Sequence, residues 1–269
     1  MSKLPTVYIP HGGGPCFFMD WNPPDEWDEM AAYLRRLPED IGEKPRAMLV
    51  ISAHWEEPVV TIQKKAAPAL LFDYYGFPPH TYELTYPAPG APDLSDRIAG
   101  LLNDAGIENR FDTERDFDHG VFIPLKVAFP DADIPIVQVS LRADLDPAAH
   151  LALGRALAPL RDEGVLIVGS GMSYHNMRVL MRPSPPGSVD AASQAFDAWL
   201  TETLTGAAGD TRKAALEAWS SQPSARDVHP REEHLLPLHV VAGAAMNDAG
   251  RCTYAGAVMG AAVSGYQFG

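Results

Sequence analysis

The stretch Ala47 to Glu56, AMLVISAHWE, most constrains how this 269-residue chain can fold. Its residues Met48 to Ile51 form an unbroken apolar run. Such a run is typical of a strand that is covered on both faces, as in a parallel sheet with helices above and below it. His54 follows the run within three residues. The stretch therefore predicts an α/β fold in which a buried strand ends next to a potential metal ligand.

Two other stretches repeat this arrangement of an apolar run followed by a histidine. Thr6 to His11 reads TVYIPH, and Val165 to His175 reads VLIVGSGMSYH. In open α/β sheets, functional groups gather outside the carboxyl ends of the strands. We therefore expect His11, His54 and His175 to converge, and imidazole nitrogens in such a cluster suit a transition metal. The alternative is that these are three unrelated loop histidines.

Helical and strand-like patterns alternate along the rest of the chain. We expect helices over residues 25–37, 93–105, 121–129, 147–163, 188–204 and 210–219, and further strands over 59–63, 108–111 and 134–141. A loop that becomes a helix is expected over 229–245, and a closing hairpin over 253–268. The alternation predicts an α/β fold with a largely parallel or mixed central sheet, flanked by helices, and an active site at the C-terminal ends of the strands. The chain shows no internal repeat or composition break, so one domain over residues 1–269 is expected.

Composition limits the class of partner. A formal net charge of −14 and a pI near 4.9 argue against nucleic acid or an anionic membrane as the partner, because both attract basic surfaces. The N-terminus lacks the long apolar region of a signal peptide, and no apolar stretch is long enough to span a bilayer. Cys16 and Cys252 are the only cysteines, which fits a reducing compartment. We expect a cytoplasmic protein with a small-molecule ligand.

Six short motifs become specific when they are read together. In chain order they are PHGGGP, SAHW, FDYYGFP, DHGVFIPL, GSGMSYHN and EEHLLPL. With these motifs the chain resembles the class III extradiol ring-cleavage dioxygenases, in particular the 4,5-DOPA dioxygenase type, over nearly its whole length. The resemblance implies a single catalytic domain that opens the ring of a substituted catechol, DOPA-like or caffeate-like. It also implies a non-haem metal and O2 as the second substrate.

The resemblance further implies roles for individual residues. His11, His54 and His234 would hold the metal, and His175 would be the acid/base residue beside the open coordination positions. His119, in the DHG motif, resembles a further active-site histidine that contacts substrate or oxygen; its alternative is a loop histidine bonded to backbone. Fe(II) is expected for activity, and Zn(II) can occupy the same imidazoles in the isolated protein.

Several alternatives stay open from the residues alone. His175 is alternatively a fourth ligand in a zinc-loaded form. Glu232 or Glu233 is alternatively a metal ligand or a partner of one, because the wider superfamily uses two histidines and a carboxylate. His239 is disfavoured as a ligand, since residues five apart on a helix, as His234 and His239 would be, point in different directions. A zinc-dependent hydrolase and a non-catalytic metal-binding protein are the alternative functions.

Overall fold

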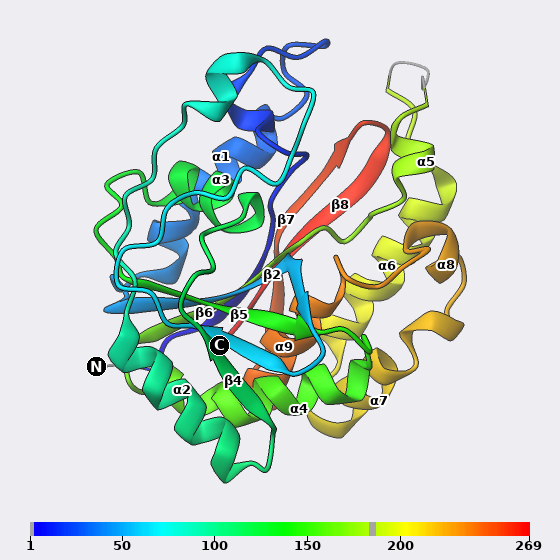
Figure 1. Ribbon diagram of the computed structural model, residues 1–269. Coiled ribbons are helices and arrows are strands. Elements are labelled where there is room, and N and C mark those ends of the chain that lie inside the picture. Colours follow the sequence, from blue (N-terminus) through cyan, green and yellow to red (C-terminus); the bar gives the residue numbers. More distant parts are fainter. Residues whose placement is uncertain (1–2, 183–186) are drawn as a thin grey trace.

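The computed structural model describes residues 3–182 and 187–269, which build a single α/β domain around one mixed sheet (Figure 1). The strand order is β4-β3-β5-β2-β6-β1-β8-β7. The central strands run parallel to one another and are β5 (Ile136–Arg142), β2 (Ala47–Glu57), β6 (Val165–Gly171) and β1 (Thr6–Pro10). The predicted sheet, largely parallel or mixed, is confirmed.

Antiparallel pairs occur on both sides of this parallel centre. On one side β3 (Val60–Gln63) lies antiparallel to β5 and parallel to the edge strand β4 (Asn109–Asp112). On the other side β8 (Ala261–Phe268) lies antiparallel to β1 and forms a hairpin with β7 (Gly250–Val258), which is red in Figure 1. The predicted closing hairpin is therefore present.

The unbroken apolar run of β2 is explained by burial on both faces of the sheet. Met48 and Val50 pack into one hydrophobic cluster, whereas Leu49 and Ile51 pack into the other. All four side chains are inaccessible to solvent. Successive side chains of a strand point to opposite faces, so a strand with helices on both sides needs apolar residues at every position.

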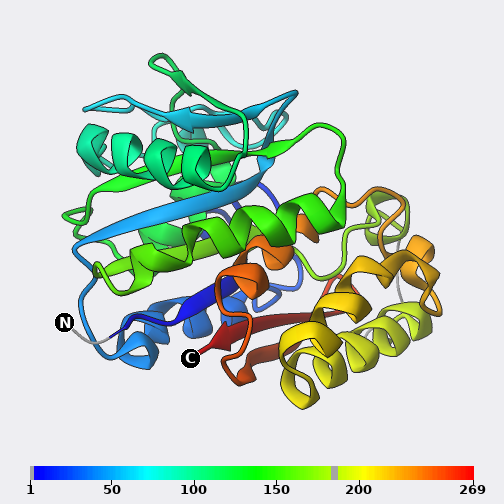
Figure 2. The ribbon, with the colours of Figure 1, turned by 90° about the horizontal axis from the view of Figure 1, so that it is seen from below.

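Helices cover the two faces of the sheet as separate layers (Figures 1 and 2). One layer contains α1 (Asp28–Ile41) and α3 (His119–Ala128), which contact each other. The opposite layer contains α2 (Pro92–Asp104), α4 (Pro147–Leu157) and α9 (Leu236–Ala244). Beyond the hairpin lie α6 (Ala191–Gly206) and α7 (Gly209–Glu217), and the short helices α5 (Met177–Leu180) and α8 (Ala225–Val228) complete the fold. Among the described residues, no helix is long and apolar enough to cross a membrane.

Several predicted boundaries were wrong for identifiable reasons. Helix α2 begins at Pro92, one residue earlier than predicted, because proline is suited to the first helical position. Helix α4 ends at Leu157 and is followed by a 3-10 turn at Ala158–Arg161, so the helix does not extend to residue 163. Helix α1 starts at Asp28 and runs to Ile41, later at both ends than predicted.

The end of β2 also differs from the prediction, which placed His54 after the strand. The strand continues through His54 to Glu57. Its pairing with β5 shifts register between Ile51 and Glu56, which marks a bulge around the histidine. Bulges re-aim side chains in a strand and are frequent next to active sites. His54 therefore lies within the strand, at the place where its pairing is irregular.

Candidate active site

His11, His54 and His234 come together although they are far apart in sequence. His11 directly follows β1, His54 lies within β2, and His234 lies in the turn before α9. Each offers one ring nitrogen, and these nitrogens all lie within 4.8 Å of one another. The Nε2 atoms of His11 and His54 are 3.1 Å apart. The predicted convergence at the carboxyl ends of parallel strands is thus present for His11 and His54, and α9 brings in the third imidazole.

Hydrogen bonds determine which nitrogen of these rings carries the proton. The Ser170 hydroxyl donates to the carbonyl of Gly120, so it accepts from Nδ1 of His11, 3.1 Å away. Nδ1 of His234 lies 3.0 Å from Oε1 of Glu233, and an ionised carboxylate can only accept. In both neutral rings Nε2 therefore keeps its lone pair. Metal-binding histidines are commonly oriented in this way by a partner on the other nitrogen.

The surroundings keep the imidazoles uncharged. Burial is the main cause that lowers the pKa of His11 and of His234 well below the usual value, and the neighbouring histidines add to it. Burial also lowers the pKa of His54, and His119 contributes. Three neutral imidazoles whose ring nitrogens lie within 4.8 Å of one another are a donor set that fits a divalent transition metal such as iron or zinc.

His175 lies beside this trio, in the loop after β6. Its Nδ1 lies 3.1 Å from Oε1 of Glu233, the same oxygen that contacts His234. The rings of His175 and His234 stack, with centroids 3.3 Å apart and an interplanar angle of 17°. Burial alone would raise the pKa of Glu233, but the hydrogen bond from His175 and the charge of Arg231 lower it overall. An ionised Glu233 therefore orients both rings.

The two adjacent glutamates have different partners. Glu233 contacts the histidines, whereas Glu232 forms an ion pair with Arg226 at 2.7 Å. Arg231 reaches the other oxygen of Glu233 at 3.3 Å and also pairs with Glu56, near the end of β2. This ion-pair chain connects the loop of His234 to the strand of His54.

His119 is the first residue of α3, so its placement in a loop was wrong. Its Nδ1 lies 2.8 Å from Oδ1 of Asp73, and its ring centroid is 3.9 Å from that of His54. The alternative of a loop histidine whose ring is bonded to backbone is therefore also wrong. Asp73 was missed by the sequence analysis. Its signal was an acidic residue inside the aromatic FDYYGFP motif.

A second missed residue, Asp118, lies beneath the site and is fully buried. Its carboxylate accepts hydrogen bonds from Ser52 at 2.7 Å and from Arg115 at 2.8 Å. Gly120 allows α3 to approach this close, because a Cβ there would clash with the Ser52 hydroxyl and crowd the His54 ring. The DHG motif thus contains a buried carboxylate, a histidine of the site and a glycine that lets α3 pack closely.

The glycines of β6 also allow a close approach between backbone segments. A Cβ at Gly171 would clash with the carbonyl oxygen of His234, and one at Gly169 would collide with the carbonyl of Pro237. The Tyr8 hydroxyl donates to the same His234 carbonyl at 2.7 Å. The absence of side chains at these two positions therefore lets β6 lie close to the backbone that carries His234.

Other buried histidines lie outside this cluster. Nε2 of His229 is 2.9 Å from the carbonyl of Ser173, and Nε2 of His239 is 3.0 Å from the carbonyl of Leu216. Burial lowers the pKa of His229 to about 3 and that of His239 to about 4. His239 lies inside α9 with its ring nitrogens facing backbone carbonyls, which agrees with its rejection as a ligand.

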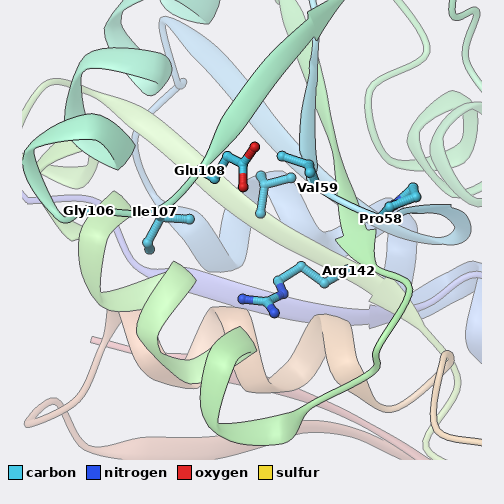
Figure 3. A pocket seen from close by; sticks show the side chains of 7 residues that line it. Pro58, Val59, Gly106, Ile107, Glu108 and Arg142 are labelled. Carbon is cyan, nitrogen blue, oxygen red and sulfur yellow. The ribbon is translucent and has the colours of Figure 1, made fainter.

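A hollow of about 270 Å³ elsewhere on the molecule does not coincide with the histidines. It lies between the β2–β3 turn and the residues preceding β4 (Figure 3). Its lining includes Glu108 and Arg142 but no histidine. The hollow therefore lies apart from the imidazole cluster.

An α/β sheet that gathers imidazoles at the ends of its parallel strands defines a metal-dependent enzyme. The chain matches the family described as "Catalytic LigB subunit of aromatic ring-opening dioxygenase" over residues 5–262. It belongs to this family. It is accordingly a metal-dependent extradiol dioxygenase that opens aromatic rings.

Similar proteins support this membership over most of the chain. A 4,5-DOPA dioxygenase extradiol of Beta vulgaris is 40% identical over 245 residues, which are 89% of this chain and 86% of the relative. The protein of the same name from Escherichia coli K12 is 33% identical over 90% of this chain and 86% of its own length. A crystal structure of an uncharacterized protein from Escherichia coli K12 superposes with a TM-score of 0.79 at 29% identity, covering 99% of this chain and 100% of the other.

Proposed function

We propose that this protein uses Fe(II), held by His11, His54 and His234, to cleave a substituted catechol with O2. The observation that carries the proposal is the convergence of three neutral imidazoles within 4.8 Å of one another. The curated relatives named 4,5-DOPA dioxygenase extradiol support a DOPA-like or caffeate-like substrate. Residues 1–269 form its catalytic domain, and it works in the cytoplasm, where its free cysteines stay reduced.

Bound Fe(II) would supply a centre at which catechol and O2 meet and exchange electrons, which Zn(II) cannot do because it has no accessible redox change. The protein's neutral imidazoles leave the charge of the ion unbalanced, so the site favours a catechol that binds as an anion. His11, His54 and His234 would hold the metal, which would bring catechol and O2 together at one centre.

His175 is proposed as the acid/base residue instead of a fourth ligand. His175 groups with Glu233 and His234, and it is not a member of the group formed by His11, His54 and His234. Because Glu233 accepts from Nδ1 of His175, Nε2 carries the lone pair and can take a proton from a catechol hydroxyl. His119, likewise held through Nδ1, presents its Nε2 to substrate or oxygen.

Metal reloading tests the proposal. The protein is stripped of metal and loaded anaerobically with Fe(II) or with Zn(II); a substituted catechol is added and oxygen is then admitted. The iron-loaded sample should consume O2 in proportion to catechol and form a coloured ring-opened product. The zinc-loaded sample should bind catechol without consuming O2. Absence of oxygen uptake by the iron-loaded protein across a broad catechol panel would contradict the proposal.

A further inference from the structure

We infer that Asp73 is a positioning residue of the active site: it holds His119 in the tautomer whose Nε2 accepts a hydrogen bond or a proton from substrate or oxygen. The inference rests on the proposed function, in which His119 contacts one of these molecules. Asp73 itself lies behind the His119 ring and acts through it.

The contacts of Asp73 determine the tautomer. Oδ1 accepts from the backbone N–H of His119 at 3.0 Å and lies 2.8 Å from its Nδ1. An ionised carboxylate accepts hydrogen bonds and cannot donate them, so Nδ1 must carry the proton and Nε2 keeps the lone pair. An aspartate carboxylate is ionised at neutral pH, so both hydrogen bonds run from His119 to Asp73. The same logic orients metal-bound histidines through a carboxylate.

The other oxygen of Asp73 faces the metal side of the site. Oδ2 lies 3.9 Å from Nδ1 of His54, which is beyond hydrogen-bond distance. The atoms of His54, Asp73 and His119 are close enough to hold an ion. However, Oδ1 already accepts two N–H groups, and His54 belongs to the trio of proposed ligands. A positioning carboxylate therefore explains this geometry better than a second metal site does.

The backbone holds Asp73 in place independently of its side chain. Leu70 forms a parallel bridge with Phe117, and the N–H of Leu71 donates to the Phe117 carbonyl at 2.8 Å. The neighbour Tyr74 is buried, and its hydroxyl donates to the carbonyl of Thr81 at 2.6 Å. The segment thus runs alongside the start of α3 and presents Asp73 to His119. Replacement of the Asp73 side chain should leave this frame intact.

The test uses iron-loaded protein and a matched pair of substitutions. Asp73→Asn keeps an acceptor oxygen, whereas Asp73→Leu has a similar size and no acceptor. We expect Asp73→Leu to lower kcat by roughly 10- to 100-fold, the usual effect of losing the partner of an active-site histidine. KM and iron content should change much less, and Asp73→Asn should recover most of kcat. Combined with His119→Gln, Asp73→Leu should cause no further loss, because both changes remove one function.

The outcomes separate failure of the inference from failure of the proposed function. Wild-type turnover in His119→Gln would remove the proposed role of His119 and the inference with it. An impaired His119→Gln beside a fully active Asp73→Leu would overturn the role of Asp73 alone. Equal losses in Asp73→Asn and Asp73→Leu, or an additive loss in the double variant, would also overturn it. Loss of iron from Asp73→Leu would show that Asp73 supports the proposed ligand His54 and not His119.

Discussion

The histidines of the site differ in the partners of their Nδ1 atoms. Nδ1 of His11 bonds to a serine hydroxyl, that of His175 to Glu233, and that of His119 to Asp73. In each case Nε2 is the nitrogen left for metal, substrate or proton. The ligand and acid/base roles proposed for these histidines therefore make separable predictions.

Metal content should distinguish a ligand from the acid/base residue. His54→Ala removes one of three converging nitrogens and should lower iron affinity at least 10-fold. His175→Gln should keep the metal and lose about 10²- to 10⁴-fold in kcat, the usual range for a positioned acid/base. The exposed His80 is the control: His80→Ala should change neither quantity. Metal analysis of the purified variants, followed by oxygen uptake at matched iron content, measures both effects; full iron binding by His54→Ala would disprove its ligand role.

Acid should destabilise the fold through His239. Burial lowers its pKa in the folded state to about 4, below the usual 6.5 of the unfolded chain, so unfolding takes up a proton at intermediate pH. Its contribution is complete above about pH 6.5 and is lost as the pH falls towards 4, a difference of roughly 3 kcal/mol. Urea unfolding of metal-free wild type and His239→Gln across this range should show the weaker pH dependence in the variant. Identical slopes would contradict this account.

Strand β6 can lie close to the backbone of His234 because Gly171 has no side chain. Gly171→Ala would push a Cβ into the carbonyl oxygen of His234. We expect a loss of about 1–3 kcal/mol in the free energy of unfolding, as for other overpacked positions, and at least a 10-fold loss in metal affinity because His234 must move. Calorimetry and metal titration measure the two effects.

Gly100, in the middle of α2, provides the matched control. Among the described residues, no heavy atom lies within 4 Å of a Cβ built there. Gly100→Ala should therefore raise stability by about 0.5–1 kcal/mol, because alanine is the better helix former, and leave metal affinity unchanged. If both glycine variants bound metal like the wild type, the close approach of β6 would not matter for the site.

Arg161 connects the two ends of the chain, since its guanidinium reaches the carbonyl of Leu4 and, at 3.5 Å, the carbonyl of Phe268. Its buried guanidinium donates to the carbonyls of Leu4 and Ala244 at 2.8 and 3.0 Å and pairs with Asp248 at 2.6 Å. Arg161→Leu leaves these carbonyls without donors and should lower the free energy of unfolding by about 3 kcal/mol or more. Activity per folded molecule should persist, because the residue lies away from the histidine cluster.

Arg36→Leu is the control for the stability predicted for Arg161→Leu. Arg36 forms an exposed pair with Asp40 at 3.4 Å, and such surface pairs contribute about 0–1 kcal/mol. Arg36→Leu should therefore shift a urea unfolding curve little, whereas Arg161→Leu should shift it strongly. Equal shifts of the unfolding curves for the two variants would show that the contacts of Arg161 contribute no more to stability than an exposed ion pair.

The sequence by itself determined the α/β class and the family. The unbroken run Met48 to Ile51 predicted a strand buried on both faces, and the packing of alternate residues into two clusters confirms it. The order of the histidine motifs indicated the family before any contact was known, and the family comparison confirms it. The strand follows from a local apolar pattern, whereas the family follows from the resemblance of the ordered motifs.

The tertiary structure alone decided which partner each histidine has. Asp73 and His119 are separated by 46 positions and meet only because the Leu70 segment runs beside Phe117. Of two adjacent glutamates, only Glu233 contacts the histidines, a choice that no sequence pattern distinguished. Proton positions on imidazole depend on contacts between distant segments, and local spacing carries no information about such contacts.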